Sequence, residues 1–137
     1  METINKMHIE TPKQPVPKSQ EDVFNFLVDI KNFEKLMPEN INKFEVLDEK
    51  TFKFALKGMP EIILRLMEKY PNQKLVLGAP SKKLSFTLTV TVDPLGDSKS
   101  EVGMDFQGEF NAMMAMMIKT PITNFMDAHS TNMPKAI

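Results

Sequence analysis

A regular alternation of apolar and polar residues over positions 84–92 constrains the fold of this chain more than any other feature. Apolar side chains alternate there with hydroxyl side chains: Leu84, Phe86, Leu88, Val90 and Val92 against Ser85, Thr87, Thr89 and Thr91. A period of two is typical of a strand with one buried and one solvated face. After a loop with Pro94 and Gly96, the pattern resumes with apolar residues at 102, 104, 106 and 110. The sequence therefore predicts an antiparallel hairpin whose apolar face must be covered.

Shorter patterns predict the rest of the sheet and two short helices. Residues 2–11 are expected to form a first strand, which prolines at 12, 15 and 17 should end. Ser19 is a suitable N-cap for a helix with apolar residues at 23, 24, 26, 27 and 30. A second short helix, about 30–37, should stop at Pro38. From residue 41 onward the period of two returns, with turns near 48–50, 58–61 and 71–73.

The last segment, about 112–133, has helical periodicity and supplies the cover for the sheet. Its apolar side carries Met114, Met117, Ile118, Ile122 and Phe125. Because a one-sided sheet must bury its apolar face, this amphipathic helix is the expected partner. The prediction is one α+β domain over 1–137, a curved antiparallel sheet wrapped around a long C-terminal helix, with two short helices after the first strand.

Composition excludes several classes of function. The 137 residues include no cysteine, which excludes disulfides and zinc–thiolate sites. A net charge of −1 argues against a nucleic-acid surface. The N-terminal residues do not resemble a secretion signal, and no apolar stretch reaches the ~20 residues that a membrane span needs. We therefore expect a cytoplasmic protein without a bound cofactor. No lipase, metalloprotease or phosphate-loop motif occurs.

Several short segments carry a resemblance to a known superfamily. They are the entry to the first helix at 17–24, the end of the second helix at Leu36-Met37-Pro38, the Lys57-Gly58 turn, and the strand exit at 68–71. With the order of elements, they make the chain similar to the Bet v 1-like or START-related superfamily, and within it to polyketide cyclase/dehydrase-like (SRPBCC) bacterial proteins. The resemblance implies a helix-grip fold that encloses a cavity for lipids, sterols, quinones or polyketides. A minority of such proteins are enzymes, and some are co-chaperones.

We therefore expect a small apolar ligand between the sheet and the last helix. The inward-facing apolar residues would form its wall: Phe54, Leu64, Leu66, Leu75, Leu77, Phe86, Leu88, Met104, Phe106, Met114, Ile118 and Phe125. The sequence does not separate wall residues from ordinary core residues, since both uses require the same side chains.

Three polar residues are candidates for contacts inside this pocket. Strict alternation from Ile62 points Glu68 and Tyr70 inward, where a carboxylate could act as an acid or base. The alternative is that a bulge or the strand end turns Glu68 to solvent. His129 falls on the apolar side of the last helix, either as a pocket group or as a structural histidine. His8 is expected to face outward, and the two histidines have no metal-ligand spacing, so we predict no metal site.

The methionine cluster 113–117 leaves other functions open. Met113 and Met116 fall on the polar side of the helix, where they would line a cavity mouth or a homodimer contact. Besides the binding protein, two alternatives remain: a cyclase/dehydrase-type enzyme that uses Glu68 or His129, and a co-chaperone-like interaction domain.

Overall fold

The structure is a computed structural model that describes residues 4–59, 61–80 and 85–136. Its strands are β1 (Ile4–Glu10), β2 (Gln14–Val16), β3 (Ile41–Val46), β4 (Thr51–Leu56), β5 (Ile62–Tyr70), β6 (Lys74–Gly78), β7 (Ser85–Gly96) and β8 (Lys99–Asn111). Its helices are α1 (Gln20–Val28), the 3₁₀ helix η1 (Ile30–Leu36) and α2 (Ala112–Ala136). The predicted element order and the α+β class are confirmed.

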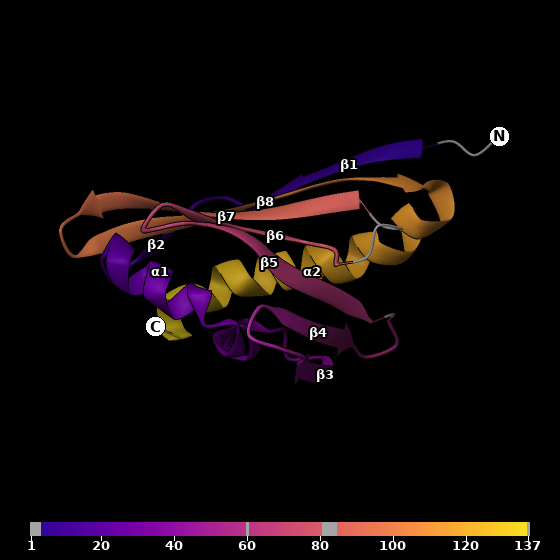
Figure 1. Cartoon of the computed structure of the whole chain (residues 1–137), viewed down its shortest axis with the longest axis horizontal. Coiled ribbons are helices and arrows are strands. Elements are labelled where there is room, and N and C mark those ends of the chain that lie inside the picture. The colour runs from indigo at the N-terminus through magenta and orange to yellow at the C-terminus, as the bar shows by residue number, and fades with distance from the viewer. Residues whose placement is uncertain (1–3, 60, 81–84, 137) are drawn as a thin grey trace.

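The eight strands found in the described part of the chain belong to one antiparallel sheet. The order across it is β1-β8-β7-β6-β5-β4-β3, and β2 pairs separately with β8. In the view of Figure 1, α2 runs along the sheet, with β7, β8 and β1 on one side of it and β4 and β3 on the other. The sheet therefore curves around the helix, and the core lies between them.

The β7–β8 hairpin matches the alternation that defines it in the sequence. Leu88 lies opposite Phe106, and Val90 opposite Met104. All four side chains are buried, whereas Thr87 is exposed and Thr89, between Leu88 and Val90, is half-buried. Leu84, at the start of the predicted strand, lies outside the described residues. One face of this hairpin thus supplies a continuous apolar floor for α2.

Side-chain hydrogen bonds cap the starts of α1 and α2 and connect α2 to η1. The Ser19 hydroxyl accepts a hydrogen bond from the Asp22 amide at 3.2 Å, as expected for the N-cap of α1. The Asn111 side chain does the same for the Met114 amide at 2.8 Å, where α2 begins. Near its other end, Asn132 donates to the carbonyls of Leu36 and Met37. This contact ties the end of α2 to η1, so the short helices close one end of the core.

The proline-rich segment corrects one prediction. We expected the prolines after residue 11 to prevent pairing, but Gln14–Val16 form the short strand β2 against residues 100–102 of β8. β2 follows β1 along the same edge of β8, where β1 pairs with residues 105–111. Pro15 is tolerated because an edge strand needs no amide hydrogen bond on its open side.

Gly108 on β8 is a position where any side chain would collide with the core. A Cβ there would lie 2.6 Å from Phe110 Cε2 and 2.8 Å from Phe86 Cβ. Phe86 Cβ moves only with β7, so we expect Gly108→Ala to lower the free energy of unfolding by roughly 1–3 kcal/mol in urea titrations. Gly103→Ala on the same strand is the control, because its Cβ meets only the flexible Lys13 side chain at 3.3 Å. Equal stability of the two variants would contradict this packing.

Candidate ligand-binding cavity

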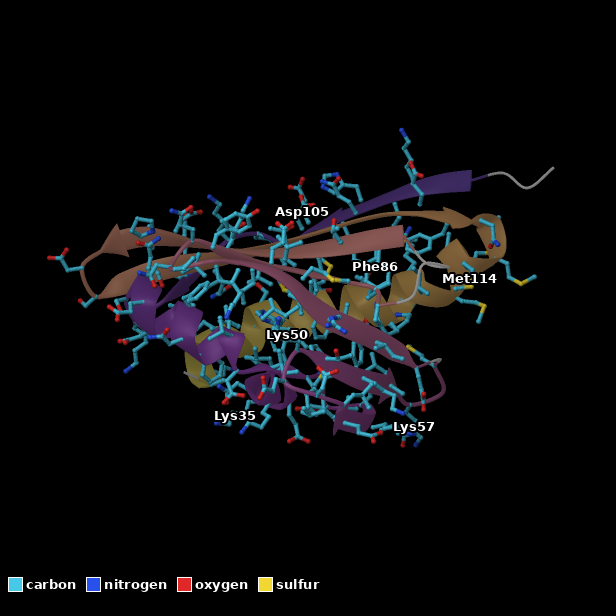
Figure 2. The ribbon with its side chains drawn as sticks, in the orientation of Figure 1. Lys35, Lys50, Lys57, Phe86, Asp105 and Met114 are labelled. Atoms are coloured by element: carbon cyan, nitrogen blue, oxygen red, sulfur yellow. The ribbon has the colours of Figure 1, made fainter. Side chains whose placement is uncertain are left out.

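An apolar cavity lies between the sheet and the first half of α2. Its volume is about 180 Å³. The lining comes from the start of β5, the segment after β6, the interior faces of β7 and β8, and α2: Glu61, Ile62, Ile63, Ala79, Pro80, Phe86, Phe106, Met114, Met117, Ile118 and Ile122. Figure 2 shows Phe86 and Met114 at the same end of the molecule, where β7 and α2 begin. The cavity is thus remote from the end that η1 closes.

The mouth of the cavity combines exposed apolar side chains with one ion pair. Ile63 and Met117 line the cavity and are 37% and 46% exposed, so they form part of its rim. Glu61 accepts a hydrogen bond from Lys43 Nζ at 3.0 Å, and Lys53 Nζ lies 4.0 Å away. The hydrogen bond from Lys43 and the positive charge of both lysines lower the pKa of Glu61. Glu61 is therefore an ionised carboxylate at neutral pH, beside an apolar opening.

Of the predicted wall, four residues line this cavity and eight lie elsewhere in the core. Phe86, Phe106, Met114 and Ile118 are in the lining. The others are buried in the packed core: Phe54, Leu64, Leu66, Leu75, Leu77, Leu88, Met104 and Phe125. The aromatic rings among them stack on one another, with Phe54 and Phe125 centroids 4.9 Å apart. These closely packed rings fill the space in which the sequence analysis predicted the ligand pocket.

The structure corrects the inward orientation expected for Glu68 and Tyr70. A register shift between Leu66 and Glu68 marks a bulge in β5, and both Glu68 and Tyr70 are exposed. The Tyr70 hydroxyl donates a hydrogen bond to Glu68 at 2.6 Å on this outer surface. One extra residue in a strand reverses the facing of every residue after it. Neither side chain lines the cavity.

His129 is fully buried but lies apart from the cavity. Its ring packs against Phe33, at a centroid distance of 5.5 Å, and against Phe125 at 6.1 Å. Neither ring nitrogen has a hydrogen-bond partner among the residues that the structure describes. Burial lowers the pKa of His129 to about 3. The imidazole is therefore neutral at physiological pH and enclosed by aromatic rings, and it is absent from the cavity lining.

The exposed methionines divide as the helical wheel predicts, with one exception. Met113 and Met116 are 72% and 81% exposed, and neither lines the cavity. Met117 was expected on the buried face, but it lies at the cavity rim. Met114, one turn before Ile118, points to the interior and packs against the core. Of these methionines, Met117 therefore contributes to the mouth, and the two highly exposed ones do not.

Sequence reasoning did not identify Glu61, Ile63, Ala79 and Pro80 as site residues. Glu61 and Pro80 occur in segments that resemble ordinary turns, and Ile63 is out of phase with the inward face of β5. No sequence signal marks such positions, because a cavity mouth forms where a strand end and a loop meet a helix from elsewhere in the chain. Met117 and Ile122 were recognisable only as members of the apolar side of α2.

The chain was compared with known proteins by sequence and by structure. No family model matches it, and no curated protein matches its sequence. Its structure is similar to a norcoclaurine synthase point mutant from Thalictrum flavum, solved in complex with a transition-state analogue. The TM-score is 0.63 at 14% identity, covering 98% of this chain and 97% of that one.

Two bacterial structures agree with that likeness. A START superfamily protein from Mycobacterium smegmatis has a TM-score of 0.62 at 11% identity, covering 98% of this chain and 99% of that one. This chain has a Bet v 1/START-like fold. The Mll3558 protein from Rhizobium loti, at 18% identity and a TM-score of 0.63 over 95% of this chain and 99% of that one, is similar too. The START-like fold confirms the helix-grip arrangement expected from the sequence.

The described helices of this START-like chain were also searched for membrane spans. None of them combines the length and the apolar character that crossing a bilayer requires.

Proposed function

We propose that this chain binds a small apolar or amphipathic molecule in the cavity between the sheet and the first half of α2. The observation that carries the proposal is the cavity itself, about 180 Å³ in volume, in which Glu61 is the single charged residue among the lining residues that the structure describes. An engineered protein cavity of about 150 Å³ with an apolar lining stays dry and binds benzene. An apolar space of this kind is therefore a favourable site for an apolar group.

The volume restricts the size of the ligand. Pockets for drug-sized molecules are usually about 300–1,000 Å³, so this one takes something smaller. A one- or two-ring quinone or polyketide-like molecule fits the available space, as does the end of a lipid acyl chain. A complete sterol would require the cavity to expand.

The charged groups at the mouth set the orientation of an amphipathic ligand. Its apolar part would lie against Phe86, Phe106 and Ile118, deep in the lining. Its polar end would remain at the mouth, within reach of the ion pair of Glu61 and Lys43. A polar group there keeps contact with water and with fixed charges, which avoids the cost of burying it without a partner.

The proposal does not include catalysis. The sequence-based enzyme hypothesis depended on Glu68 or His129 inside the pocket. Glu68 is exposed on the outside of the sheet, and His129 is enclosed by Phe33 and Phe125 away from the cavity. An acid–base role needs contact with the bound molecule, which neither position provides.

A tryptophan at the cavity rim tests the proposal. The chain has no tryptophan, so Met117→Trp creates a single fluorophore at the mouth. Met113→Trp is the matched control, four residues earlier on the same helix, highly exposed and outside the lining. Two probes separate ring from chain ligands: 1,4-naphthoquinone, which quenches tryptophan, and decanoate, which displaces bound quinone if it shares the site.

We expect saturable quenching of Met117→Trp by 1,4-naphthoquinone, with a dissociation constant of roughly 10 µM to 1 mM for so small a ligand. Met113→Trp should show only linear, collisional quenching. Competition by decanoate would extend the ligand class to acyl chains, and its absence would restrict the class to rings. Linear quenching of both variants, without displacement, would contradict binding at this mouth.

A further inference from the structure

A group of side chains of metal-ligating types lies on the outer face of the sheet, away from the cavity. His8 and Glu10 of β1 meet Asp105 of β8 there. His8 Nε2 lies 2.8 Å from Asp105 Oδ2 and 3.0 Å from Glu10 Oε1. One nitrogen and two carboxylate oxygens, one from each residue, all lie within 4.8 Å of one another. Within 4–59, 61–80 and 85–136, this is the one such group of metal-ligating side chains.

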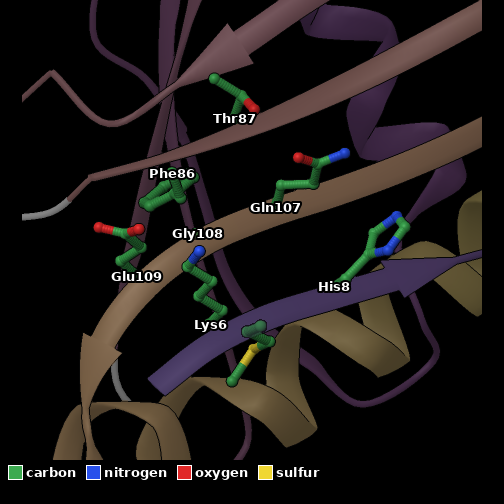
Figure 3. A pocket seen from close by; sticks show the side chains of 8 residues that line it. Lys6, His8, Phe86, Thr87, Gln107, Gly108 and Glu109 are labelled. Atoms are coloured by element: carbon green, nitrogen blue, oxygen red, sulfur yellow. The ribbon is translucent and has the colours of Figure 1, made fainter. Parts of the chain in front are cut away.

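Strand pairing holds these three side chains together. Glu10 is directly opposite Asp105 in the β1–β8 ladder, and His8 is opposite Gln107. Residues two apart on a strand share a face, so His8 and Glu10 point the same way. Figure 3 shows His8 on β1 and Gln107 on β8 on the same side of the sheet. The Gln107 amide donates to Asp105 Oδ1 at 3.0 Å, which leaves Oδ2 directed at His8.

The three ligand atoms have the chemistry and spacing of a metal site with open positions. An imidazole nitrogen with two carboxylate oxygens is a donor set that zinc and its neighbours in the first transition series accept. At metal–ligand bonds of about 2.0–2.1 Å, adjacent donors lie about 3.0–3.4 Å apart. The separation of His8 Nε2 from Glu10 Oε1, 3.0 Å, already lies at the edge of this range, and the 2.8 Å separation from Asp105 Oδ2 requires only a small opening. With a neutral imidazole, the two carboxylates carry a charge of −2, which balances a divalent ion.

Solvent has access to the group from one side. The side chains of His8, Glu10 and Asp105 are 51%, 64% and 35% exposed. A metal bound by these three residues would keep its remaining positions for water or a small anion, because structural sites are closed by four protein ligands and this one is not.

We propose that His8, Glu10 and Asp105 form a binding site for a divalent transition-metal ion of the zinc class. The ion bridges β1 and β8 on the outer face of the sheet. The site is independent of the cavity, because Met7 and Ile9, the neighbours of His8 in sequence, pack against the core on the opposite face. Failure of either proposal therefore leaves the other intact.

Zinc titration against a chromophoric chelator tests the site, with the full chain buffered well above the usual pKa of histidine, because the hydrogen bond to Asp105 raises the pKa of His8. We expect one zinc ion per chain. His8→Gln and Asp105→Asn should each weaken binding by at least about tenfold, which is the minimum usual for loss of a group that orients a metal ligand. Glu109→Gln is the matched control, since it removes one exposed carboxylate from the same strand, β8, outside the group of three. That variant should bind zinc like the unmodified chain.

Histidine resonances give a readout that does not depend on the chelator. The chain has two histidines, and His129 is fully buried. Zinc should shift the imidazole signals of His8 and leave those of His129 unchanged. It should also raise the melting temperature of Glu109→Gln but not that of His8→Gln. Equal zinc affinity in the His8, Asp105 and Glu109 variants, or His8 ring signals that zinc does not shift, would overturn the proposal. The three residues would then form only an ion-pair network.

Discussion

Replacing His129 by phenylalanine is expected to make the stability of this protein less sensitive to acid below pH 6.5. His129 is fully buried between Phe33 and Phe125, and its pKa is lowered to about 3 from a usual 6.5. In the unfolded chain the same ring takes up a proton below pH 6.5. The unfolded state therefore gains protons that the folded state does not bind between these two values, and stability falls as pH falls through this range.

The size of the effect follows from the separation of the two pKa values. Each pH unit between them costs about 1.4 kcal/mol of unfolding free energy, so the loss at pH 5 is about 2 kcal/mol relative to neutral pH. His129→Phe has no such linkage, and it also removes two buried nitrogens without partners among the described residues. We expect the variant to be at least as stable as the unmodified chain at neutral pH, and clearly more stable at pH 5.

Urea unfolding at a series of pH values measures this difference. His129→Leu serves if phenylalanine proves too large for the site. His8→Gln is the control, because His8 is exposed. Its replacement should not remove the loss of unfolding free energy at acid pH. Parallel stability curves for the unmodified chain and His129→Phe would contradict the burial of a neutral imidazole at this position.

Phe125→Ala is expected to cause the largest loss of stability that a single truncation produces here. The Phe125 ring is fully buried, 4.9 Å from Phe54 and 6.4 Å from Phe33 between ring centroids. It connects α2 to both β4 and η1. Truncation of a buried phenylalanine costs about 3–5 kcal/mol, which is a large part of the 5–15 kcal/mol typical of a domain.

This substitution also tests whether Phe125 belongs to the packed core or to the wall of a ligand pocket. The sequence assigned Phe125 to the wall, whereas the structure packs it among other rings outside the lining of the cavity. Chemical denaturation should give the loss stated above for Phe125→Ala and a smaller one for Phe125→Leu, which remains measurable if the alanine variant does not fold. A loss below about 1 kcal/mol for Phe125→Ala would mean that open space surrounds the ring.

The fold was predictable because its signals are local and repeated. The alternation that ends in Val92, the N-cap at Ser19 and the apolar stripe of α2 each depend on residues close in sequence. Each element then has one apolar face, and a sheet around a helix is a simple way to bury all of them. The pairing of β2 was missed because an edge strand tolerates Pro15, which a central strand would not.

The site was less predictable because it depends on what tertiary packing leaves unfilled. Phe86 and Phe125 are the same residue type and both lie on apolar faces, yet only Phe86 of the two borders the cavity. The inward orientation of Glu68 was wrong and the bulge alternative was correct, but the choice was not predictable because the β5 bulge adds one residue without any change in the pattern before it. The contact of His8 with Asp105 is a pairing across 97 positions, which no local spacing reveals.

The measurement that tests the central claim most directly is a methyl NMR map of the protein titrated with 1,4-naphthoquinone. The methionine and isoleucine methyl groups report on both ends of α2 without any substitution. We predict saturable shifts for the lining residues Met114, Met117, Ile118 and Ile122, and none for Met133, which is buried near the other end of the helix. Shifts confined to the highly exposed Met113 and Met116, or spread evenly over both ends, would contradict a ligand cavity between the sheet and the first half of α2.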